Sequence, residues 1–320
     1  MKGNQCGRVL LLTFCLLLMI GSGWNASVAS SQTTSRFVLI EGDGTQIVLP
    51  QLPRRVVVLS WSTAEILAHL GIRPVGVPAS LQVLPPQLQG IPEVGMAMRP
   101  DIEKIKNVRP DLVIASSQFK ATLKPILVDH GMRSYFIDNQ LYTDGLASIT
   151  KLGLAFDRQE VAERLLAGIK KRERAVLARI AGRRPPRVLI IFGTSESFML
   201  AREDSYVGDL VRTLRGVNVT TAMSSGGMFS GYVPFSLEKV VESNPEVILR
   251  IAHGNPETTT AIFQKEFASD PVWKRLEAIK RGRVYDLEAE LFFANPGLKS
   301  IDALEKLAEL LYGLPAKGLK

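Results

Sequence analysis

Hydrophobic residues form short continuous runs, separated by longer segments in which apolar residues recur every three or four positions. The short runs are rich in β-branched residues and predict buried parallel strands, whereas the periodic segments predict amphipathic helices. The predicted strands are 55–60, 132–137, 188–192, 247–251 and 284–287. The alternation in 37–49 predicts a β-hairpin that turns at residues 42–44. The predicted helices include 120–129, 143–154, 206–214, 271–279 and 301–311. Strands that alternate with helices are typical of the α/β class, in which helices cover a parallel sheet.

One helix–proline–strand unit occurs twice, in residues 101–115 and in residues 238–254. When the two segments are aligned on their prolines, Glu103 falls on Glu238, at a separation of 135 residues. A unit repeated at this distance predicts two related lobes rather than a short-period solenoid. The alternative is that any two βα units of an α/β protein look alike.

The longest periodic segment runs from Asp157 to Ala181 and ends at Gly182. Its apolar residues lie on one stripe and predict a single amphipathic helix. The stripe consists of Val161, Leu165, Ile169, Val176 and Ile180. We expect this helix, within 157–182, to connect an N-terminal α/β lobe at 36–156 to a C-terminal α/β lobe at 183–315. The predicted fold is therefore two Rossmann-like lobes joined by one long helix.

The first 29 residues have the organisation of an export signal. Lys2 and Arg8 form a positively charged start, residues 9–20 form a short apolar run, and small residues follow. The apolar run is too short to span a bilayer comfortably, which favours removal of the segment over a permanent anchor. We expect Ala29 to be the last residue removed and the rest of the chain to be exported, to the periplasm or to the outer face of the cytoplasmic membrane.

Both cysteines of the chain, Cys6 and Cys15, precede that cleavage point. The exported chain would therefore contain no thiol and no disulfide, so its stability must come from its core. A lipid anchor on Cys15 is the alternative. The bulky Phe14 before that cysteine, and its position inside the apolar run, favour cleavage over lipidation.

The formal net charge of +8 raises the question of nucleic-acid binding. The basic residues are scattered except in 170–174 and in the pair Arg183 and Arg184, and no basic motif is interleaved with aromatic residues. We interpret the charge as a solvated basic surface and expect no nucleic-acid partner.

The candidate binding residues are a histidine and two methionines. His253 follows a predicted strand, and open α/β sheets place ligand-binding loops at the carboxyl ends of their strands. The other histidines, His69 and His130, lie in or beside predicted helices, and we interpret them as structural. Met96 and Met98 lie in a loop, where core packing explains a methionine less readily than on a helix face.

The sequence gives little support for an enzyme. Residues 193–197 superficially resemble a nucleophile motif but depart from G-x-S-x-G, and no histidine–carboxylate pair is evident that would activate a serine. Histidines and carboxylates are not clustered at metal-ligand spacing either. We therefore expect no catalytic activity.

Two segments carry a resemblance to a known family. Residues 94–104 read V-G-M-A-M-R-P-D-I-E-K, and residues 244–254 end in His-Gly directly after a strand. With the two-lobe layout and the export signal, they resemble the substrate-binding proteins of ABC importers for vitamin B12, siderophores and haem. Within that class the chain is similar to the haem-binding components of iron-regulated surface-determinant haem uptake systems. The similarity extends from about Arg55 to Tyr312, and the His-Gly sequence is its more specific part.

The resemblance implies that haem b is carried in a cleft between the lobes. In those proteins a methionine of the first lobe and a histidine of the second hold the iron, and the matching residues are Met98 and His253. Haem iron accepts both thioether and imidazole as axial ligands. Met96 is a second sulfur close to Met98, so the choice between them stays open. We expect Ser62 or Thr63 to cap a predicted helix, and both are candidates for binding the propionates, because free backbone N–H groups at a helix start favour anions.

The resemblance also implies a membrane partner. In this class one glutamate of each lobe forms salt bridges with arginines of an ABC permease dimer, and the matching residues are Glu103 and Glu238. A protein with a twofold repeat can present such a pair to a twofold partner. We expect the chain to deliver haem to a permease for iron acquisition, and an upstream haem-donor protein is a further candidate partner.

Two alternatives remain. A cobalamin-binding or siderophore-binding protein would have the same fold but would not require both Met98 and His253. A chelatase-like metalloenzyme would share the two-lobed α/β design. It is disfavoured because the sequence shows neither a metal-ligand cluster nor an activated nucleophile.

Overall fold

The computed structural model describes residues 37–79, 85–194, 197–221, 231–252, 261–263, 265–267, 270–292 and 294–315. All of them belong to one compact unit. We use "first lobe" for the described residues up to 155 and "second lobe" for those from 187 onward. His253 lies outside the described residues, as do the predicted export signal and Cys15.

The first lobe is built on a parallel sheet with the strand order β3-β6-β7. These strands are β3 (Val56–Val58), β6 (Leu112–Ser116) and β7 (Ser134–Ile137). Its helices are α1 (Trp61–His69), α2 (Ile102–Asn107), α3 (Lys120–Asp129) and α4 (Tyr142–Ala155). Alternate residues of β6 join different core clusters, Leu112 and Ile114 in one and Val113 and Ala115 in the other. Both faces of the sheet are therefore covered, which explains why its strands read as continuous apolar runs.

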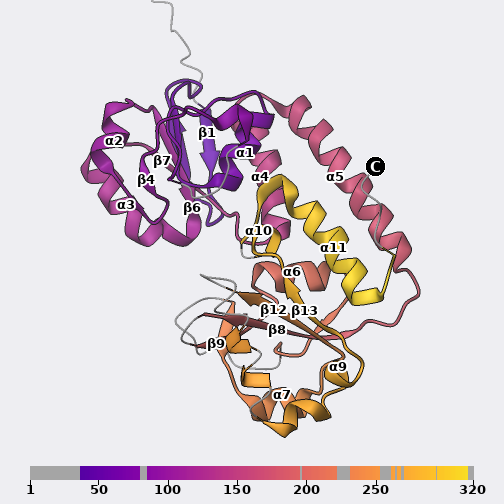
Figure 1. Cartoon of the computed structure of the whole chain (residues 1–320). Helices are drawn as coiled ribbons and strands as arrows, with labels where there is room; N and C mark the ends of the chain where they lie inside the picture. The colour runs from indigo at the N-terminus through magenta and orange to yellow at the C-terminus, as the bar shows by residue number, and fades with distance from the viewer. Residues whose placement is uncertain are drawn as a thin grey trace, which may run out of the picture. The chain divides into compact units, whose positions relative to one another are not determined.

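The second lobe contains a mixed sheet with the order β11-β9-β8-β12-β13, and β10 also pairs with β8 (Figure 1). Its strands are β8 (Arg187–Gly193), β9 (Phe198–Ala201), β10 (Val217–Asn218), β11 (Tyr232–Pro234), β12 (Val247–Ala252) and β13 (Val284–Leu287). Its helices are α6 (Tyr206–Thr213), α7 (Leu237–Ser243), α9 (Glu277–Lys280), α10 (Ala289–Phe292) and α11 (Ser300–Tyr312). Strands β8, β12 and β13 run parallel, whereas β9 runs antiparallel to β8.

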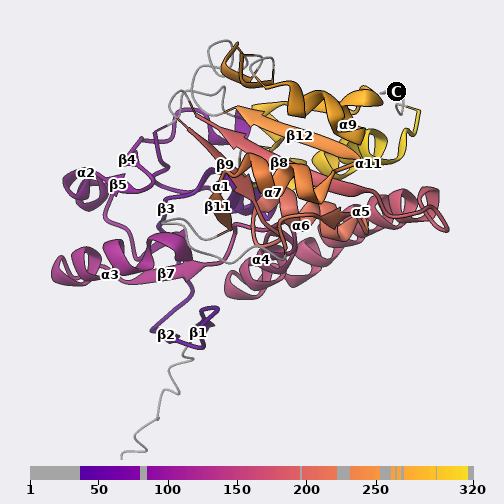
Figure 2. The same cartoon turned by 90° about the horizontal axis from the view of Figure 1, so that it is seen from below.

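Helix α5 (Gln159–Arg179) links the two lobes in the chain and has 21 residues, within the predicted 157–182. It buries Ala162, Ile169 and Val176, which lie seven residues apart, and packs against α4 and α11 (Figure 1, Figure 2). On its flank Arg172 pairs with Asp302 at 2.6 Å and with Glu305 at 2.9 Å. Among the described residues, no helix is both long enough and apolar enough to cross a membrane.

The repeated unit recurs in the structure at the same separation. Helix α2 begins after Asp101 and helix α7 after Ser236, and each of these side chains accepts the backbone N–H three residues later. Ile105 and Val240 then enter the core, both fully buried. The equivalence therefore includes the helix caps as well as the apolar pattern.

The ends of the two units match as closely. Arg109 and Asn244 are both left-handed, with φ of 45° and 37°, before the prolines on which the sequences align. Arg55 donates to the carbonyls of Val108 and Arg109 at the end of α2, and Arg187 donates to the carbonyl of Ser243 near the end of α7. These guanidinium groups satisfy helix carbonyls that have no partner within the helix.

One predicted helix is divided in two. Residues 271–275 form a 3₁₀-helix and α9 begins only at Glu277, whereas the apolar periodicity predicts one helix over 271–279. Leu276 between them is extended, with ψ of 138°, and both Trp273 and Leu276 are buried. Tertiary burial of these two side chains thus overrides the local helical pattern.

A β-hairpin is attached to the first lobe by a charged cluster. Strands β1 (Phe37–Ile40) and β2 (Gln46–Leu49) pair antiparallel, as predicted for 37–49. Glu41 at the turn is only 4% exposed; it accepts the N–H of Phe136 at 2.8 Å and pairs with Lys120, which also pairs with Asp43. The hydrogen bond from Lys120 holds the pKa of the Asp43 carboxyl well below its ordinary value.

The Asp43 pairing should make the stability of this lobe depend on pH. A carboxyl whose pKa is lowered on folding stabilises the fold above its unfolded pKa, here about 4, and this contribution is lost as pH falls toward the folded pKa. We expect Asp43→Asn to melt at a lower temperature than the wild type at pH 7, and this gap should shrink steadily below about pH 4. Thermal denaturation followed by circular dichroism across this pH range measures it. A gap that does not change with pH would contradict the assignment.

Candidate functional site

Met98 lies at the tip of a small hairpin in the first lobe. Strands β4 (Gly95–Met96) and β5 (Arg99–Pro100) pair antiparallel, so Ala97 and Met98 form the turn between them. Gly95 adopts φ of 90°, and a side chain there would approach the backbone of Asp101 within 2.6 Å, so this position requires glycine. Met98 is 57% exposed and Met96 is 59% exposed. Neither sulfur is used to fill the core, so both are available to a ligand.

A hollow of 270 Å³ opens beside Met98. It is lined by Met98, Arg99, Pro100, Ile102, Thr122, Leu123 and Ile126, from β5, α2 and α3. Aliphatic side chains make up most of this wall, and Ile126 is 39% exposed there. The thioether of Met98 therefore lies at the rim of an apolar surface, as expected for a site that receives an apolar ligand.

The same hairpin is connected to the start of α1. The N–H of Ala79 donates to the carbonyl of Gly95 at 2.8 Å, and the indole of Trp61 donates to the carbonyl of Ala79 at 3.4 Å. Trp61 is the first residue of α1. These contacts hold the Met98 hairpin and the N-terminus of α1 next to each other in the first lobe.

Helix α1 begins earlier than the sequence predicts. Its N-cap is Ser60, whose hydroxyl accepts the N–H of Thr63, so the prediction that Ser62 or Thr63 caps the helix is wrong. Ser60 ends the extended segment after β3, and its side chain reaches the third helical N–H, as an N-cap should. Thr63 is fully buried and donates to Ser60, whereas Ser62 is partly exposed. Of the two residues predicted to bind propionates, only Ser62 is accessible.

A polar network joins this helix start to the ends of two other strands. Asn139, just after β7, donates from its amide nitrogen to the hydroxyl of Ser60 at 2.8 Å. Ser116, the last residue of β6, donates to the amide oxygen of Asn139 at 2.7 Å. The carboxyl ends of β3, β6 and β7 are thus connected through one amide side chain. Sequence reasoning missed both Ser60 and Asn139, although the position of Asn139 after a predicted strand was a usable signal.

The second lobe contributes the end of β12, directly before His253. Ala252 pairs with Gly193, so β8 and β12 end side by side. Arg250 forms a fork with Asp286 of β13 at 2.7 and 2.5 Å, and its guanidinium lies over the rings of Phe263 and Phe267. The strand leading to His253 is therefore held on both sides by its neighbours in the sheet.

Several side chains connect the two lobes directly. Asp209 of α6 is fully buried and accepts both the N–H and the hydroxyl of Thr143, at 2.9 and 3.0 Å, in the first turn of α4. Asn295 donates to the carbonyl of Leu141 at 2.5 Å. The second lobe thereby supplies an acceptor for the N–H of Thr143, which as a first-turn group has no carbonyl within that helix, and a second donor to the carbonyl of Leu141, which also accepts the N–H of Gly145.

Gly297 of the second lobe packs directly on the start of α1. With φ of 66° it lies so close that an added Cβ would be 3.0 Å from the Cα of Ser62. It also adjoins Glu65, and burial raises the pKa of the Glu65 carboxyl above its ordinary value. Ser62 therefore lies where the two lobes meet.

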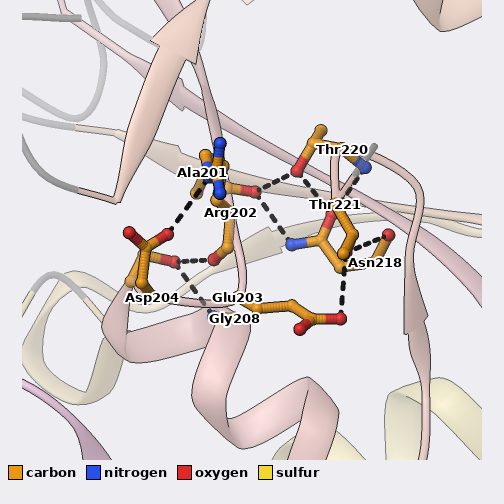
Figure 3. A network of polar contacts seen from close by, with 9 residues as sticks. Ala201, Arg202, Glu203, Asp204, Gly208, Asn218, Thr220 and Thr221 are labelled. Carbon is orange, nitrogen blue, oxygen red and sulfur yellow. Dashed lines mark hydrogen bonds and ion pairs between the residues drawn. The ribbon is translucent and has the colours of Figure 1, made fainter. Parts of the chain in front are cut away.

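A further network surrounds the start of α6 (Figure 3). Asn218 and Thr220 both donate to the carbonyl of Ala201, at 2.9 and 3.0 Å, and Arg202 pairs with Asp204 at 3.3 Å. Gly208 approaches the carbonyl of Arg202 so closely that no side chain could fit. This network fixes the turn that positions α6, and with it Asp209.

The predicted docking residues lie at equivalent places in the two lobes. Glu103 and Glu238 are each the second residue of their helix, α2 and α7, and both are exposed. Glu103 also pairs with Lys106 at 2.8 Å. A carboxylate in the first turn of a helix complements the helix dipole whether or not it has a partner.

Within the described parts of the chain, no group of three or more histidine, cysteine, aspartate or glutamate side chains is arranged to hold a metal ion. The candidate sulfur, Met98, is instead a single exposed side chain at the rim of an apolar hollow. Such a surface suits a ligand whose metal ion is already coordinated by the ligand itself, because the protein then needs to add only a single side chain to the metal.

Comparison with known proteins identifies the family. The profile described as "Periplasmic binding protein" matches residues 56–291. The chain belongs to the periplasmic binding protein family. This periplasmic binding protein is 32% identical over 259 residues to the high-affinity heme uptake system protein IsdE of Staphylococcus aureus strain Newman, covering 81% of this chain and 87% of that protein.

Solved structures agree with this assignment. An ABC transporter substrate-binding protein from Listeria monocytogenes EGD-e matches with a TM-score of 0.74 and 31% identity, over 82% of this chain and all of that one. Staphylococcus aureus IsdE complexed with heme matches with a TM-score of 0.71 and 32% identity, over 81% of this chain and 98% of that one. SirA complexed with staphyloferrin B, at 0.72 and 19% identity over 86% and 98%, shows the shared fold alone. The predicted fold class is confirmed, and these relatives are transport proteins rather than enzymes.

The buried contact between the lobes of this periplasmic binding protein should be important for stability. Replacing Asp209 with alanine leaves a helix N–H and a hydroxyl of Thr143 without their acceptor, which should lower the free energy of unfolding by about 2–3 kcal/mol. Urea denaturation of the protein measures this loss. Asp204→Ala is the matched control, because its half-exposed ion pair should contribute less than about 1 kcal/mol. Equal losses in the two variants would contradict a special role for Asp209.

Proposed function

We propose that this protein is an exported haem-binding protein that carries haem b and delivers it to an ABC permease dimer for iron acquisition. The observation that carries the proposal is the exposed Met98 thioether at the rim of an apolar hollow, in a chain 32% identical to a protein solved with heme. A core methionine would be buried, and a surface methionine without function would not need a glycine-dependent hairpin to present it.

We assign the two axial positions of the iron to Met98 and His253. Imidazole and thioether are a known axial pair for haem iron, and thioether ligation favours the reduced state. Met98 occupies the turn itself, whereas Met96 pairs with Arg99 in the ladder and does not line the hollow. We therefore propose Met98 rather than Met96 as the sulfur ligand, and His253, which follows β12 in the sequence, as the nitrogen ligand.

The propionates are assigned to the start of α1. Ser62 is partly exposed there, and the first backbone N–H groups of a nine-residue helix favour an anion. Thr63 acts through its hydrogen bond to Ser60 rather than by contact, because it is fully buried. The contact between Gly297 and Ser62 supports a ligand that reaches the junction of the two lobes.

We propose that Glu103 and Glu238 dock the loaded protein on the permease. They are exposed, they occupy equivalent helical positions, and the units that carry them match in caps, buried residues and backbone conformation. A twofold permease dimer could bind both with equivalent basic residues. No nucleic-acid partner is proposed, and an upstream haem-donor protein would act before docking.

We propose that the mature chain lies outside the cytoplasm, because its first 29 residues have the organisation of an export signal. We propose cleavage after Ala29, which would leave the two-lobed protein, with its lobes at 36–156 and 183–315 and the bridging helix at 157–182, free of cysteine. An anchor on Cys15 would instead tether it to the outer face of the membrane. Both forms are compatible with binding at the Met98 site.

The second candidate function is binding of a siderophore or a cobalamin. Its only support is the shared fold, which SirA, solved with staphyloferrin B, also has. Such a ligand gives no reason for an exposed thioether beside an apolar hollow, since oxygen-rich iron chelates bring their own hard ligands. We assign no catalytic activity, and the chelatase-like alternative has no activated nucleophile in its support.

The iron assignment predicts distinct spectra for single variants. Wild-type protein titrated with haemin should give a sharp Soret band of a low-spin, six-coordinate complex. His253→Ala should abolish that spectrum, and Met98→Ala should leave a weaker, five-coordinate complex, because only one axial ligand would remain. Absorbance and magnetic circular dichroism in both oxidation states measure these changes.

Met96→Ala is the control for the neighbouring sulfur and should bind like the wild type. If Met96→Ala and Met98→Ala exchange these results, the sulfur assignment is wrong but haem binding stands. If the wild type shows no Soret band and instead binds a ferric siderophore or cobalamin, the proposed function itself fails.

If Glu103 and Glu238 dock on the permease, reversing their charges should reduce stimulation of the permease but leave haem binding unchanged. Glu103→Lys and Glu238→Lys should each slow association with the permease and weaken its salt dependence, since rim charges act mainly on association rates. The double variant should fail to stimulate ATP hydrolysis by the permease in liposomes while binding haem normally.

Glu242→Lys is the matched charge control, because it is an exposed glutamate of the same helix, α7, outside its first turn. It should stimulate hydrolysis normally. Full stimulation by the double variant would show that Glu103 and Glu238 serve only to complement their helix dipoles.

A further inference from the structure

Asn139 follows β7 and hydrogen-bonds to residues at the ends of β3 and β6, so it connects all three strand ends of the first lobe. Its amide nitrogen faces three hydroxyl oxygens, those of Ser60 at 2.8 Å, Thr63 at 3.4 Å and Ser62 at 3.5 Å. Its amide oxygen accepts from Ser116 at 2.7 Å, and Ser116 is only 2% exposed. A primary amide can donate on one side and accept on the other, so Asn139 can give a direction to the hydroxyls it touches.

The direction follows from counting donors. The Ser60 hydroxyl oxygen accepts from three donors: the Asn139 amide at 2.8 Å, the Thr63 hydroxyl at 3.2 Å and the backbone N–H of Thr63 at 3.4 Å. Its two lone pairs are therefore fully used, and the contact with Asn139 is the shortest of the three. Its own proton is then left for Ser62, whose hydroxyl oxygen lies 3.0 Å away. Because Ser62 accepts that proton, its own O–H is free to donate outward.

We infer that Asn139 is a positioning residue that orients Ser60 and thereby makes Ser62 a hydrogen-bond donor to a carboxylate of the bound ligand. This inference rests on the proposed function and names what the site selects: a ligand whose rim carries free carboxylates rather than amides. A neutral amide carbonyl on the ligand would also accept from Ser62, but a carboxylate forms the stronger, charge-assisted hydrogen bond. Two other contacts fix Ser62 where a ligand between the lobes would reach it: Gly297 of the second lobe packs on its backbone, and Trp61 is linked through Ala79 to the Met98 hairpin.

The test compares haem with haem dimethyl ester, in which both propionates are esterified. Soret titrations should be run with the wild type, Ser62→Ala, Asn139→Ala and the double variant. Loss of a hydrogen bond to a charged group should weaken haem binding about tenfold in each single variant. The double variant should be no weaker than either single one, because Asn139 acts through Ser62. The ester lacks the charge, so its affinity should change by less than about threefold in every variant.

The position of the Soret band should stay the same throughout, since the axial ligands are untouched. The inference would be overturned if Asn139→Ala weakened the binding of haem and of the ester equally, or if the losses of the two single variants added in the double variant. Either result would make Asn139 a general structural residue.

If Asn139→Ala does not fold, Ser116→Ala replaces it. This variant frees only the amide oxygen of Asn139, so it should weaken the binding of haem by a smaller factor and leave the binding of the ester unchanged. A Ser116→Ala effect that is the same for both ligands would also overturn the inference. If the wild type binds neither porphyrin, the proposed function has failed instead, and the two failures are thus distinguishable.

Discussion

Parallel strands of one sheet end on the same edge, and this constraint decides where polar side chains can gather in this protein. In the first lobe Ser116 ends β6, and Ser60 and Asn139 lie two residues after the ends of β3 and β7, so three residues far apart in the chain form one hydrogen-bonded group. In the second lobe β8 and β12 end together at Gly193 and Ala252. The strands themselves are apolar on their buried faces, because an unpartnered polar atom there would lose water without gaining a hydrogen bond.

Sequence patterns predicted most of the architecture because the relevant physics is local. The apolar stripe of α5 appears in the sequence, as do the buried runs of β8 and β12 and the hairpin of β1 and β2. The repeat could also be predicted from the sequence, because the same helix–proline–strand unit buries residues at the same positions in each lobe. The structure adds what spacing cannot reveal: the shared left-handed residues Arg109 and Asn244, and arginines that close both helix ends.

The remaining features depend on contacts between distant parts of the chain. Ser60, Ser62 and Thr63 are all capable of capping a helix, and only the fold decides that Ser60 does so. Asp209 contacts Thr143 across 66 residues, and Glu41 accepts from Phe136 across 95, and neither pairing leaves a local pattern. For the same reason, sequence reasoning proposed Thr63 as a ligand contact although its hydroxyl is buried. The exposure of Met98, in contrast, was foreseeable from its loop position.

The central claim is that one iron binds at the Met98 hairpin of a haem-loaded protein. The most direct measurement is an anomalous difference map, recorded at the iron absorption edge, from crystals of the protein grown with haemin. The account predicts a single strong iron peak at bonding distance from the sulfur of Met98, about 2.3 Å, as metal–sulfur bonds have. The claim that Met98 binds the iron would be contradicted by an iron peak at another place in the protein, or by coloured crystals that show no iron peak.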